Sequence, residues 1–356
     1  MHRPSRAVRA LAVALSAAAL AACGSDDEHD ATPTPATATD APAAEPWTAP
    51  RAVQKVTIAL DWTASVNYLG LYAALARGWF AEQGIEATIL PYAGTPAETL
   101  IEAGQADLAI SYPPDVIINR AQGLRYRAVA ALVAGNSTAL AVKADSDYTR
   151  PADLDGELYG GFGLQSDRPL ISAILRADGV AVPTFEQVVL TTSVYDALAS
   201  DRVAYSAVFG GIDDVTAEMQ GTKLRLFPFR DFLGKAGDYP NAVYVAGDET
   251  IAQRGDALRR TLAALARGYE FAAANPAEAG RILIAENQTE LSRAVDTVAR
   301  TAMATAPEFL DDTGRWGALQ DVDFAGLTAI LVEGGVVEYA PAPAELYTND
   351  LLPTSG

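Results

Sequence analysis

Residues 56–90 read VTIALDWTASVNYLGLYAALARGWFAEQGIEATIL. Val56–Leu60 is an apolar run of strand length, Leu69–Arg77 is typical of a helix, and Ala87–Leu90 is a second apolar run. A helix between two short strands favours a parallel pairing, because parallel strands need a long crossover connection. The stretch therefore predicts an α/β fold with largely parallel sheets.

The alternation continues in two groups of elements. In the first group we expect a helix capped by Thr95 that runs to Ala103 and ends at Gly104, a strand at Asp107–Ser111, and a helix at Pro114–Gln122 closed by Gly123. In the second group, from about Pro151, we expect strands around Leu158 and at Val188–Thr191, Ala204–Phe209 and Leu224–Phe227, and helices at Asp167–Ala177, around Asp196 and ending at Met219. After Pro240 we expect a strand at Ala242–Ala246 and helices at Asp256–Phe271 and Pro276–Glu286.

These groups predict two lobes joined by two passages of the chain, near Lys143 and near Tyr239. Lobe 1 is expected to comprise residues 53–143 and 241–356, and lobe 2 residues 144–240. Open α/β sheets bind ligands at the carboxyl ends of their strands, so we expect a ligand cleft between the lobes and a hinge at the two passages.

Composition excludes several classes of function. The chain has 356 residues, which is too many for one compact core, and a net charge of −19, which repels phosphate backbones and argues against nucleic-acid binding. Its one cysteine, Cys23, and its two histidines, His2 and His29, all precede the expected fold. Histidine-dependent nucleophilic catalysis and Cys/His zinc sites are therefore not expected within the lobes, which leaves carboxylates, lysine, tyrosine and a bound cofactor as possible chemistry. For a binding role we expect no cofactor and no metal.

The N-terminus resembles a bacterial lipoprotein signal. Arg3, Arg6 and Arg9 precede an apolar run from Ala10 to Ala22, which ends in Leu20-Ala21-Ala22-Cys23-Gly24. We expect residues 1–22 to be a signal peptide, Cys23 to be lipidated, and residues 23–52, which are rich in Ala, Thr and Pro, to be a flexible tether. The protein would then lie on the extracytoplasmic side, bound to the membrane through its lipid anchor alone. The alternative is a buried or membrane helix with an incidental cysteine.

Several motifs together resemble one family of ABC-transporter substrate-binding proteins, those for thiamine pyrimidine precursors, which are related in fold to yeast-type thiamine pyrimidine synthase. The resemblance covers about Lys55–Val337 and rests on residues 60–72 (LDWTASVNYLGLY), 78–85 (GWFAEQGI), 104–111 (GQADLAIS), 151–156 (PADLDG), 267–272 (RGYEFA) and 275–279 (NPAEA). It implies a type II periplasmic-binding-protein fold, a small-molecule ligand, and an ABC permease with its ATPase as partners. We expect a monomer.

Two departures from the family pattern concern the pocket. Ala64-Ser65 stands where relatives have Pro-Asn, and Tyr68 stands where they have His. A family step of Trp-Glu/Asp-Gly aligns with Ile212-Asp213-Asp214, so the acid is kept and the tryptophan is lost. Phe209 or Phe162 is then expected to close the pocket.

In lobe 1 the candidate ligand-binding residues follow the expected strands. Trp62 and Tyr68 stack on a planar heterocycle or fill the core, and Asn67 caps the next helix or hydrogen-bonds a ring edge. Ser111 follows a buried strand, where an unpartnered hydroxyl is costly. The remaining candidates are Tyr92 and Tyr112, which face the cleft or cover loop surface.

In lobe 2 the stretch Gly160-Gly161-Phe162-Gly163, followed by Ser166 and Asp167, exposes backbone N–H groups to an anionic group beside Arg168, or forms a tight turn. Asp213 is the strongest single candidate, because a carboxylate accepts two hydrogen bonds from an aminopyrimidine edge. Its alternative role is that of an acid favoured in the first turn of a helix. Tyr239 and Asn241 are expected at the hinge or in the pocket.

We therefore expect a binding protein and not an enzyme. The expected ligand is a thiamine pyrimidine precursor, then riboflavin or a similar heterocycle, and then an alkanesulfonate. The alternative from another class is a thiamine pyrimidine synthase that uses pyridoxal phosphate and consumes its own histidine, but the expected lobes lack both its cysteine-rich loop and a histidine. A sensor or scaffold lipoprotein is a third alternative.

Overall fold

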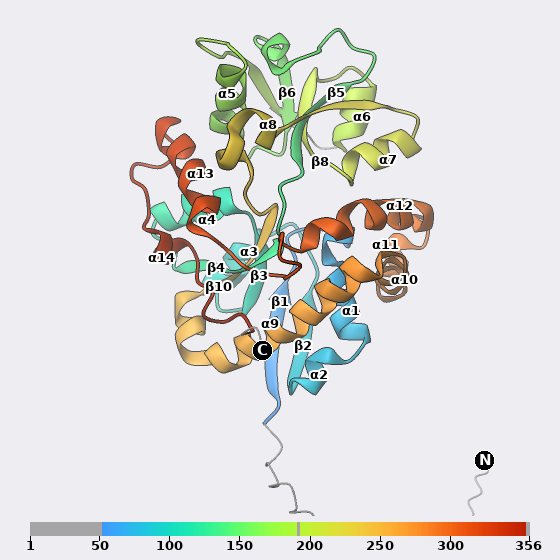
Figure 1. The fold of residues 1–356 in the computed structure, drawn as a ribbon, viewed down its shortest axis with the longest axis vertical. Coiled ribbons are helices and arrows are strands. Elements are labelled where there is room, and N and C mark those ends of the chain that lie inside the picture. Colours follow the sequence, from blue (N-terminus) through green and yellow to red (C-terminus); the bar gives the residue numbers. More distant parts are fainter. Residues whose placement is uncertain (1–51, 191–192, 354–356) are drawn as a thin grey trace, which may run out of the picture. The chain divides into compact units, whose positions relative to one another are not determined.

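A computed structural model of the chain describes residues 52–190 and 193–353 and contains two five-stranded sheets (Figure 1). The signal peptide, Cys23 and nearly all of the tether lie outside the described residues. The first sheet has the order β2-β1-β3-β10-β4 and the second the order β7-β6-β8-β5-β9. The expected α/β fold with two lobes is confirmed.

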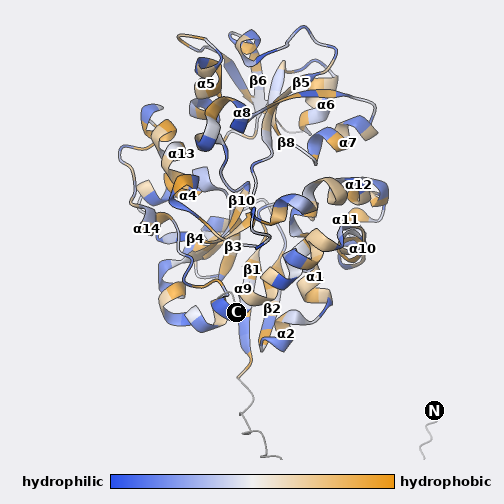
Figure 2. Ribbon diagram, in the orientation of Figure 1, coloured by the Kyte–Doolittle hydropathy of each residue, from blue (hydrophilic) through white to orange (hydrophobic). Residues whose placement is uncertain are grey.

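The first sheet begins with the strands of the quoted stretch. Its members are β1 (Gln54–Ala59), β2 (Ile85–Leu90), β3 (Leu108–Ser111), β4 (Tyr126–Val133) and β10 (Ala242–Gly247). β1 runs parallel to β2 and β3, whereas β10 runs antiparallel to β3 and β4. Figure 2 shows strands of this sheet that are largely hydrophobic and surrounding helices in which hydrophobic and hydrophilic residues alternate.

The second sheet consists of β5 (Thr138–Lys143), β6 (Leu158–Gly161), β7 (Glu186–Val189), β8 (Tyr205–Phe209) and β9 (Leu224–Pro228). β6 is parallel to β7 and β8, and β5 is antiparallel to β8 and β9. Each sheet therefore has one strand, β10 or β5, that is antiparallel to both of its neighbours. These are the strands at which the chain enters the sheet from the other lobe.

The first passage between lobes was placed wrongly from the sequence. β4 belongs to the first sheet and β5 to the second, so the chain passes between them at residues 134–137 and not near Lys143. The two apolar runs are separated by only four residues, and neither was recognised as a strand. The side chain of Asn136 donates to the carbonyl of Gly237 (2.7 Å), and the hydroxyl of Thr138 donates to the side-chain oxygen of Asn241 (3.0 Å). The two passages are thus held side by side.

Fourteen α-helices and four 3-10 helices complete the described residues. They are η1 (Val66–Tyr68), α1 (Leu69–Ala76), α2 (Trp79–Glu82), α3 (Ala97–Glu102), α4 (Pro113–Ala121), η2 (Pro151–Leu154), α5 (Asp167–Ala177), α6 (Val194–Ala199), α7 (Asp213–Met219), α8 (Phe229–Leu233), η3 (Gly234–Gly237), α9 (Asp248–Ala274), α10 (Pro276–Glu286), α11 (Gln288–Leu291), α12 (Val295–Thr305), η4 (Ala306–Phe309), α13 (Asp321–Glu333) and α14 (Pro343–Leu346). None of these helices is long and apolar enough to cross a membrane.

Two helix boundaries differ from expectation. α3 starts after Pro96, whose φ is fixed at a value suited to a helix start, and Thr95 does not cap it. α9 begins at Asp248, eight residues before the expected start, because a turn of helix precedes a kink at Arg254.

α13 packs on both lobes, which corrects the assignment of all of residues 241–356 to lobe 1. It contacts α4 beside the first sheet and both α5 and η3 beside the second. Phe324, Leu327 and Leu331 of α13 are buried in a core that also contains residues of both lobes. A third connection between the lobes therefore comes from side-chain packing.

Close packing of α1 against α9 yields a test of the fold. A Cβ at Gly268 would overlap the carbonyl oxygen of Gly70, whereas a Cβ at Gly280 of α10 would lie 3.6 Å from Ala302. Gly268→Ala is expected to destabilise the protein by about 2 kcal/mol or more. The control Gly280→Ala is expected to stabilise it by about 0.5–1 kcal/mol, because alanine is the better helix former. Urea unfolding measures both, and a Gly268→Ala protein as stable as the control would contradict this packing.

Candidate ligand-binding site

Asp61, just beyond β1, organises the candidate site. Its carboxylate accepts hydrogen bonds from the hydroxyls of Tyr68 (2.8 Å) and Tyr112 (2.5 Å). Burial raises the pKa of Asp61, and the two hydrogen bonds oppose that shift. The ends of β1 and β3 and the start of α1 are joined through this one side chain.

Aromatic rings from both lobes meet beside Asp61. The Tyr112 ring is nearly parallel to that of Phe209, with an interplanar angle of 8° and 6.1 Å between ring centroids. Trp62 lies 5.3 Å from Tyr92 and 5.9 Å from Phe162, centroid to centroid. Trp62 and Phe162 are each about half exposed, at 49% and 50%. Residues predicted from positions after strands of two different sheets are thus close together.

Three more carboxylates lie around the same strand ends. Glu98 of α3 accepts from the hydroxyl of Ser111, and burial raises its pKa. Asp115, in the first turn of α4, has a pKa raised to about 7 by burial and then by the nearby Glu98, Asp167 and Asp61 carboxylates. Burial raises the pKa of Asp167, the first residue of α5, to about 6.

Asp213 holds the end of β8, where Phe209 is the last residue. Its carboxylate accepts from the backbone N–H of Phe209 (2.8 Å), and that of Asp214 accepts from the N–H of Gly211 (2.6 Å). Burial raises the pKa of Asp213 to about 6, and Asp214 adds to the rise. Asp213 thus performs the structural role weighed for it, at the first residue of α7, and its role toward a ligand stays a prediction.

The first half of the glycine stretch of lobe 2 is strand, and Phe162 and Gly163 lie in the loop that follows it. Gly160 and Gly161 pair with β7 inside β6, where a Cβ at Gly160 would come within 2.7 Å of Val203 and one at Gly161 within 2.5 Å of the Tyr159 ring. Packing accounts for these two glycines, and contact of the stretch with an anionic group stays a prediction. Ser166 is buried and does not cap α5 with its side chain.

The other predicted residues have partners within the fold. Asn67 is buried and caps no helix, but its backbone carbonyl accepts from the hydroxyl of Tyr269 (3.0 Å). Tyr239 is buried in the core shared by both lobes. Burial raises its pKa, and a hydrogen bond with Asn136 opposes part of that rise. Tyr239 and Asn241 therefore belong to the passage between lobes.

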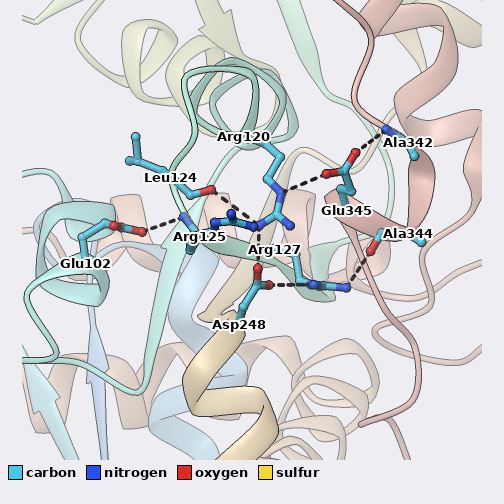
Figure 3. Close-up of polar contacts among 9 residues, drawn as sticks. All are labelled: Glu102, Arg120, Leu124, Arg125, Arg127, Asp248, Ala342, Ala344 and Glu345. Carbon is cyan, nitrogen blue, oxygen red and sulfur yellow. Dashed lines mark hydrogen bonds and ion pairs between the residues drawn. The ribbon is translucent and has the colours of Figure 1, made fainter.

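Positive charge lies elsewhere. Figure 3 shows Arg120 of α4 paired with Asp248 (2.8 Å) and, at 4.0 Å, with Glu345, while Arg127 contacts Asp248 and the carbonyl of Ala344. The guanidinium of Arg168, expected beside an anion, lies over the Phe185 ring at 4.5 Å. Among the described residues, no lysine or arginine forms an ion pair with Asp61, Glu98, Asp115, Asp167 or Asp213.

Sequence reasoning missed the acidic character of the site. Asp61 was part of the quoted motif, and its position directly after a strand was the available signal. Asp115 had the same kind of signal, as an acid at the start of a helix that follows a strand. Within residues 52–190 and 193–353, no group of three or more His, Cys, Asp or Glu residues is arranged to hold a metal ion.

Two α/β lobes whose strand ends meet at one site define a type II periplasmic-binding-protein fold. Residues 65–279, more than half of the chain, match the family described as NMT1/THI5 like, and the chain belongs to that family. The resemblance drawn from the motifs is thereby confirmed.

Named relatives share sequence with this chain, and solved structures share its fold. The chain is 28% identical over 244 residues to the formylaminopyrimidine-binding protein of Halalkalibacterium halodurans. The aligned region covers 67% of this chain and 72% of the relative. It is 29% identical over 260 residues to the riboflavin-binding protein RibY of Chloroflexus aurantiacus, covering 69% and 71%. The alkanesulfonate-binding protein SsuA from Xanthomonas axonopodis pv. citri shares the fold with a TM-score of 0.62 at 14% identity, covering 85% of this chain and 99% of SsuA. The desulfurization enzyme DSZB also shares the fold, with a TM-score of 0.55 at 14% identity over 83% and 97%.

The raised pKa values predict how stability depends on pH. Between about pH 4 and 7, folded Asp115, Asp167 and Asp213 retain protons that the unfolded chain has released, so the free energy of unfolding falls as the pH rises. We expect a lower Tm at pH 8 than at pH 5.5. Asp115→Asn should raise the Tm at pH 8 by several degrees and flatten the profile, whereas the exposed control Asp312→Asn should not. If calorimetry finds the same dependence of Tm on pH for wild type and Asp115→Asn, the pKa of Asp115 is not raised in the folded protein.

Proposed function

We propose that the protein is the extracytoplasmic substrate-binding component of an ABC importer and that it captures a small planar heterocycle between its lobes. The observation that carries the proposal is the parallel pair Tyr112 and Phe209, one ring from each sheet, beside the carboxylate of Asp61. Family membership and relatives named as binding proteins support it.

The geometry suits a ring inserted between the two aromatic faces. A planar ring in van der Waals contact with both faces needs them about 7 Å apart. The perpendicular gap between the two rings cannot exceed their centroid separation of 6.1 Å, so the faces must move apart by at least about 1 Å to admit the ligand. Stacking on both faces orients the ring plane, and the carboxylates at its rim then select its edge.

The ligand we favour is a thiamine pyrimidine precursor such as formylaminopyrimidine. Its amino group is a donor, and the candidate site offers carboxylate acceptors from both lobes. An alkanesulfonate is disfavoured, because none of the described lysines or arginines pairs with the site's acids and the Arg168 guanidinium lies over the Phe185 ring. Riboflavin is the second candidate, since its larger ring system also stacks and a relative is named for binding it.

A synthase function is opposed by the residue inventory. Every histidine and the one cysteine precede Pro50, so residues 52–353 have neither side chain to consume or to activate. The fold itself does not decide between classes, since DSZB is an enzyme. Incubation with pyridoxal phosphate and iron should yield no pyrimidine product, and stoichiometric product formation would favour the synthase.

The importer assignment includes an anchor and partners. Residues 1–22 act as signal peptide, lipidated Cys23 holds the protein at the membrane, and residues 23–52 act as a tether that lets a monomer reach an ABC permease and its ATPase. Closure of the lobes, not chemistry, distinguishes loaded from empty protein.

Binding to formylaminopyrimidine tests the aromatic pair. Phe209→Ala removes one stacking face and should weaken binding about tenfold or more, with Tyr339→Ala, at an exposed tyrosine outside the site, as control. Tyr112→Phe keeps the ring but loses the hydrogen bond to Asp61 and should weaken binding less. Titration calorimetry measures all three variants. Equal affinities for wild type and Phe209→Ala would place the ligand elsewhere.

The anchor has a test of its own. Cys23→Ala should abolish incorporation of labelled fatty acid, because no other cysteine is present. The control is the wild-type chain in the same cells. Wild-type protein that is secreted without lipid, with its mature terminus at another residue, would rule out the anchor.

A further inference from the structure

We propose that the site selects a ligand that carries a positive charge when bound, a planar base with a protonated or quaternary nitrogen. This inference rests on the proposed function and names the substrate class more narrowly. Its basis is the arrangement of acids, acceptors and aromatic rings at the strand ends of both lobes.

The acids have no positive partners within the described residues. Asp61, Glu98 and Asp213 have hydrogen-bond partners that are neutral: tyrosine hydroxyls, a serine hydroxyl and a backbone N–H. Asp167 likewise accepts from the Leu164 N–H and from the side chain of Gln187. Asp115 is influenced by burial and by other carboxylates, and by no hydrogen bond within the described part of the chain. Half-buried anions without counter-ions are costly, so a bound cation would relieve this cost.

The groups that influence Asp115 are acidic or neutral on every side. Glu98 from α3, Asp61 beyond β1 and Asp167 from α5 supply negative charge. The phenols of Tyr112, Tyr126 and Tyr239 lie near it as well. The cation on α4 itself, Arg120, is already paired with Asp248 and Glu345 (Figure 3).

A second and independent observation comes from two buried side-chain oxygens that have no partner. Thr305 is 6% exposed, and its unpartnered hydroxyl oxygen lies 3.6 Å from where a Cβ of Gly211 would stand. Gly211 is in the loop between Phe209 and Asp213. The side-chain oxygen of Asn67, a residue 9% exposed that directly precedes Tyr68, is unpartnered too. The Thr305 hydroxyl can donate or accept, whereas the carboxylates and the Asn67 oxygen accept, so acceptors outnumber donors and favour a ligand that supplies donors.

The aromatic rings fit the same class of ligand. Tyr112, Phe209 and Trp62 present ring faces, which attract a cation more strongly once water is excluded. A metal ion is the weaker alternative, because the described carboxylates do not converge as a ligand set. An organic cation spreads its charge over a ring, so it can interact with carboxylates on several sides of the candidate site.

The test compares two probes that differ in charge, formylaminopyrimidine and its ring-N-methylated cation, by titration calorimetry on the full chain at pH 8. We expect the cation to bind at least about tenfold tighter, and the neutral probe to take up a proton on binding, detected as a heat that varies with the ionisation enthalpy of the buffer. Asp115→Asn should reduce the preference for the cation several-fold. The control Asp312→Asn makes the same change in net charge at an exposed site and should retain the preference.

The outcomes separate this inference from the proposed function. If the neutral probe binds as tightly as the cation and without proton uptake, or if only riboflavin binds, the charge selection is wrong and the binding function stands. If neither pyrimidine probe nor riboflavin binds, the proposed function fails and the inference fails with it. An Asp115→Asn protein that keeps the full preference would also overturn the inference.

Discussion

The carboxylate of Asp61 is the group on which the arrangement of the site depends. It lies where β1 ends, and its two oxygens accept from Tyr68 and Tyr112, which belong to different segments of the first lobe. A buried carboxylate is expensive unless its oxygens are satisfied, so this acid specifies the positions of both tyrosines. The Tyr112 ring then meets Phe209 of the other lobe, whose own position is fixed by Asp213. One acid in each lobe thus positions one face of the aromatic pair.

The connections between lobes are compatible with a small change in the separation of the Tyr112 and Phe209 rings. The two passages are hydrogen-bonded to each other at Asn136 and Thr138, and α13 packs against helices of both lobes. A core that is continuous across α13 favours discrete arrangements of the lobes over free movement. A ring between Tyr112 and Phe209 requires their faces to move apart by at least about 1 Å, and adjustments of side chains and hinge are the movements available for this.

Local sequence pattern predicted much of the fold and part of the site. The helices at Asp167–Ala177 and Pro276–Glu286 were predicted to the residue, because their starts and ends have strong local signals. Trp62 and Tyr112 were candidates because they follow strands, and strand ends of α/β sheets meet at ligand sites. Phe209 was a candidate because the family step after it has lost its tryptophan. Strands β4 and β5 were missed, since nothing local separates two apolar runs that belong to different sheets.

The carboxylate cluster was not predictable in this way. Glu98, Asp115 and Asp167 come from three helices and become neighbours only through packing, so no spacing in the sequence joins them. Gly160 and Gly161 were expected in a loop, because two glycines are typical of turns, but they are the last two residues of β6, where Val203 leaves no room for a Cβ at Gly160. The contact with Val203 is long-range, and single-sequence patterns do not report it.

A crystal structure of the full chain with formylaminopyrimidine tests the central claim, that the ligand binds between one aromatic face from each lobe. The account predicts the pyrimidine ring between Tyr112 and Phe209, parallel to both, with its amino group toward the carboxylates of Asp61 and Asp115. A ring bound outside the two lobes, or one that leaves Tyr112 and Phe209 in mutual contact, would contradict it.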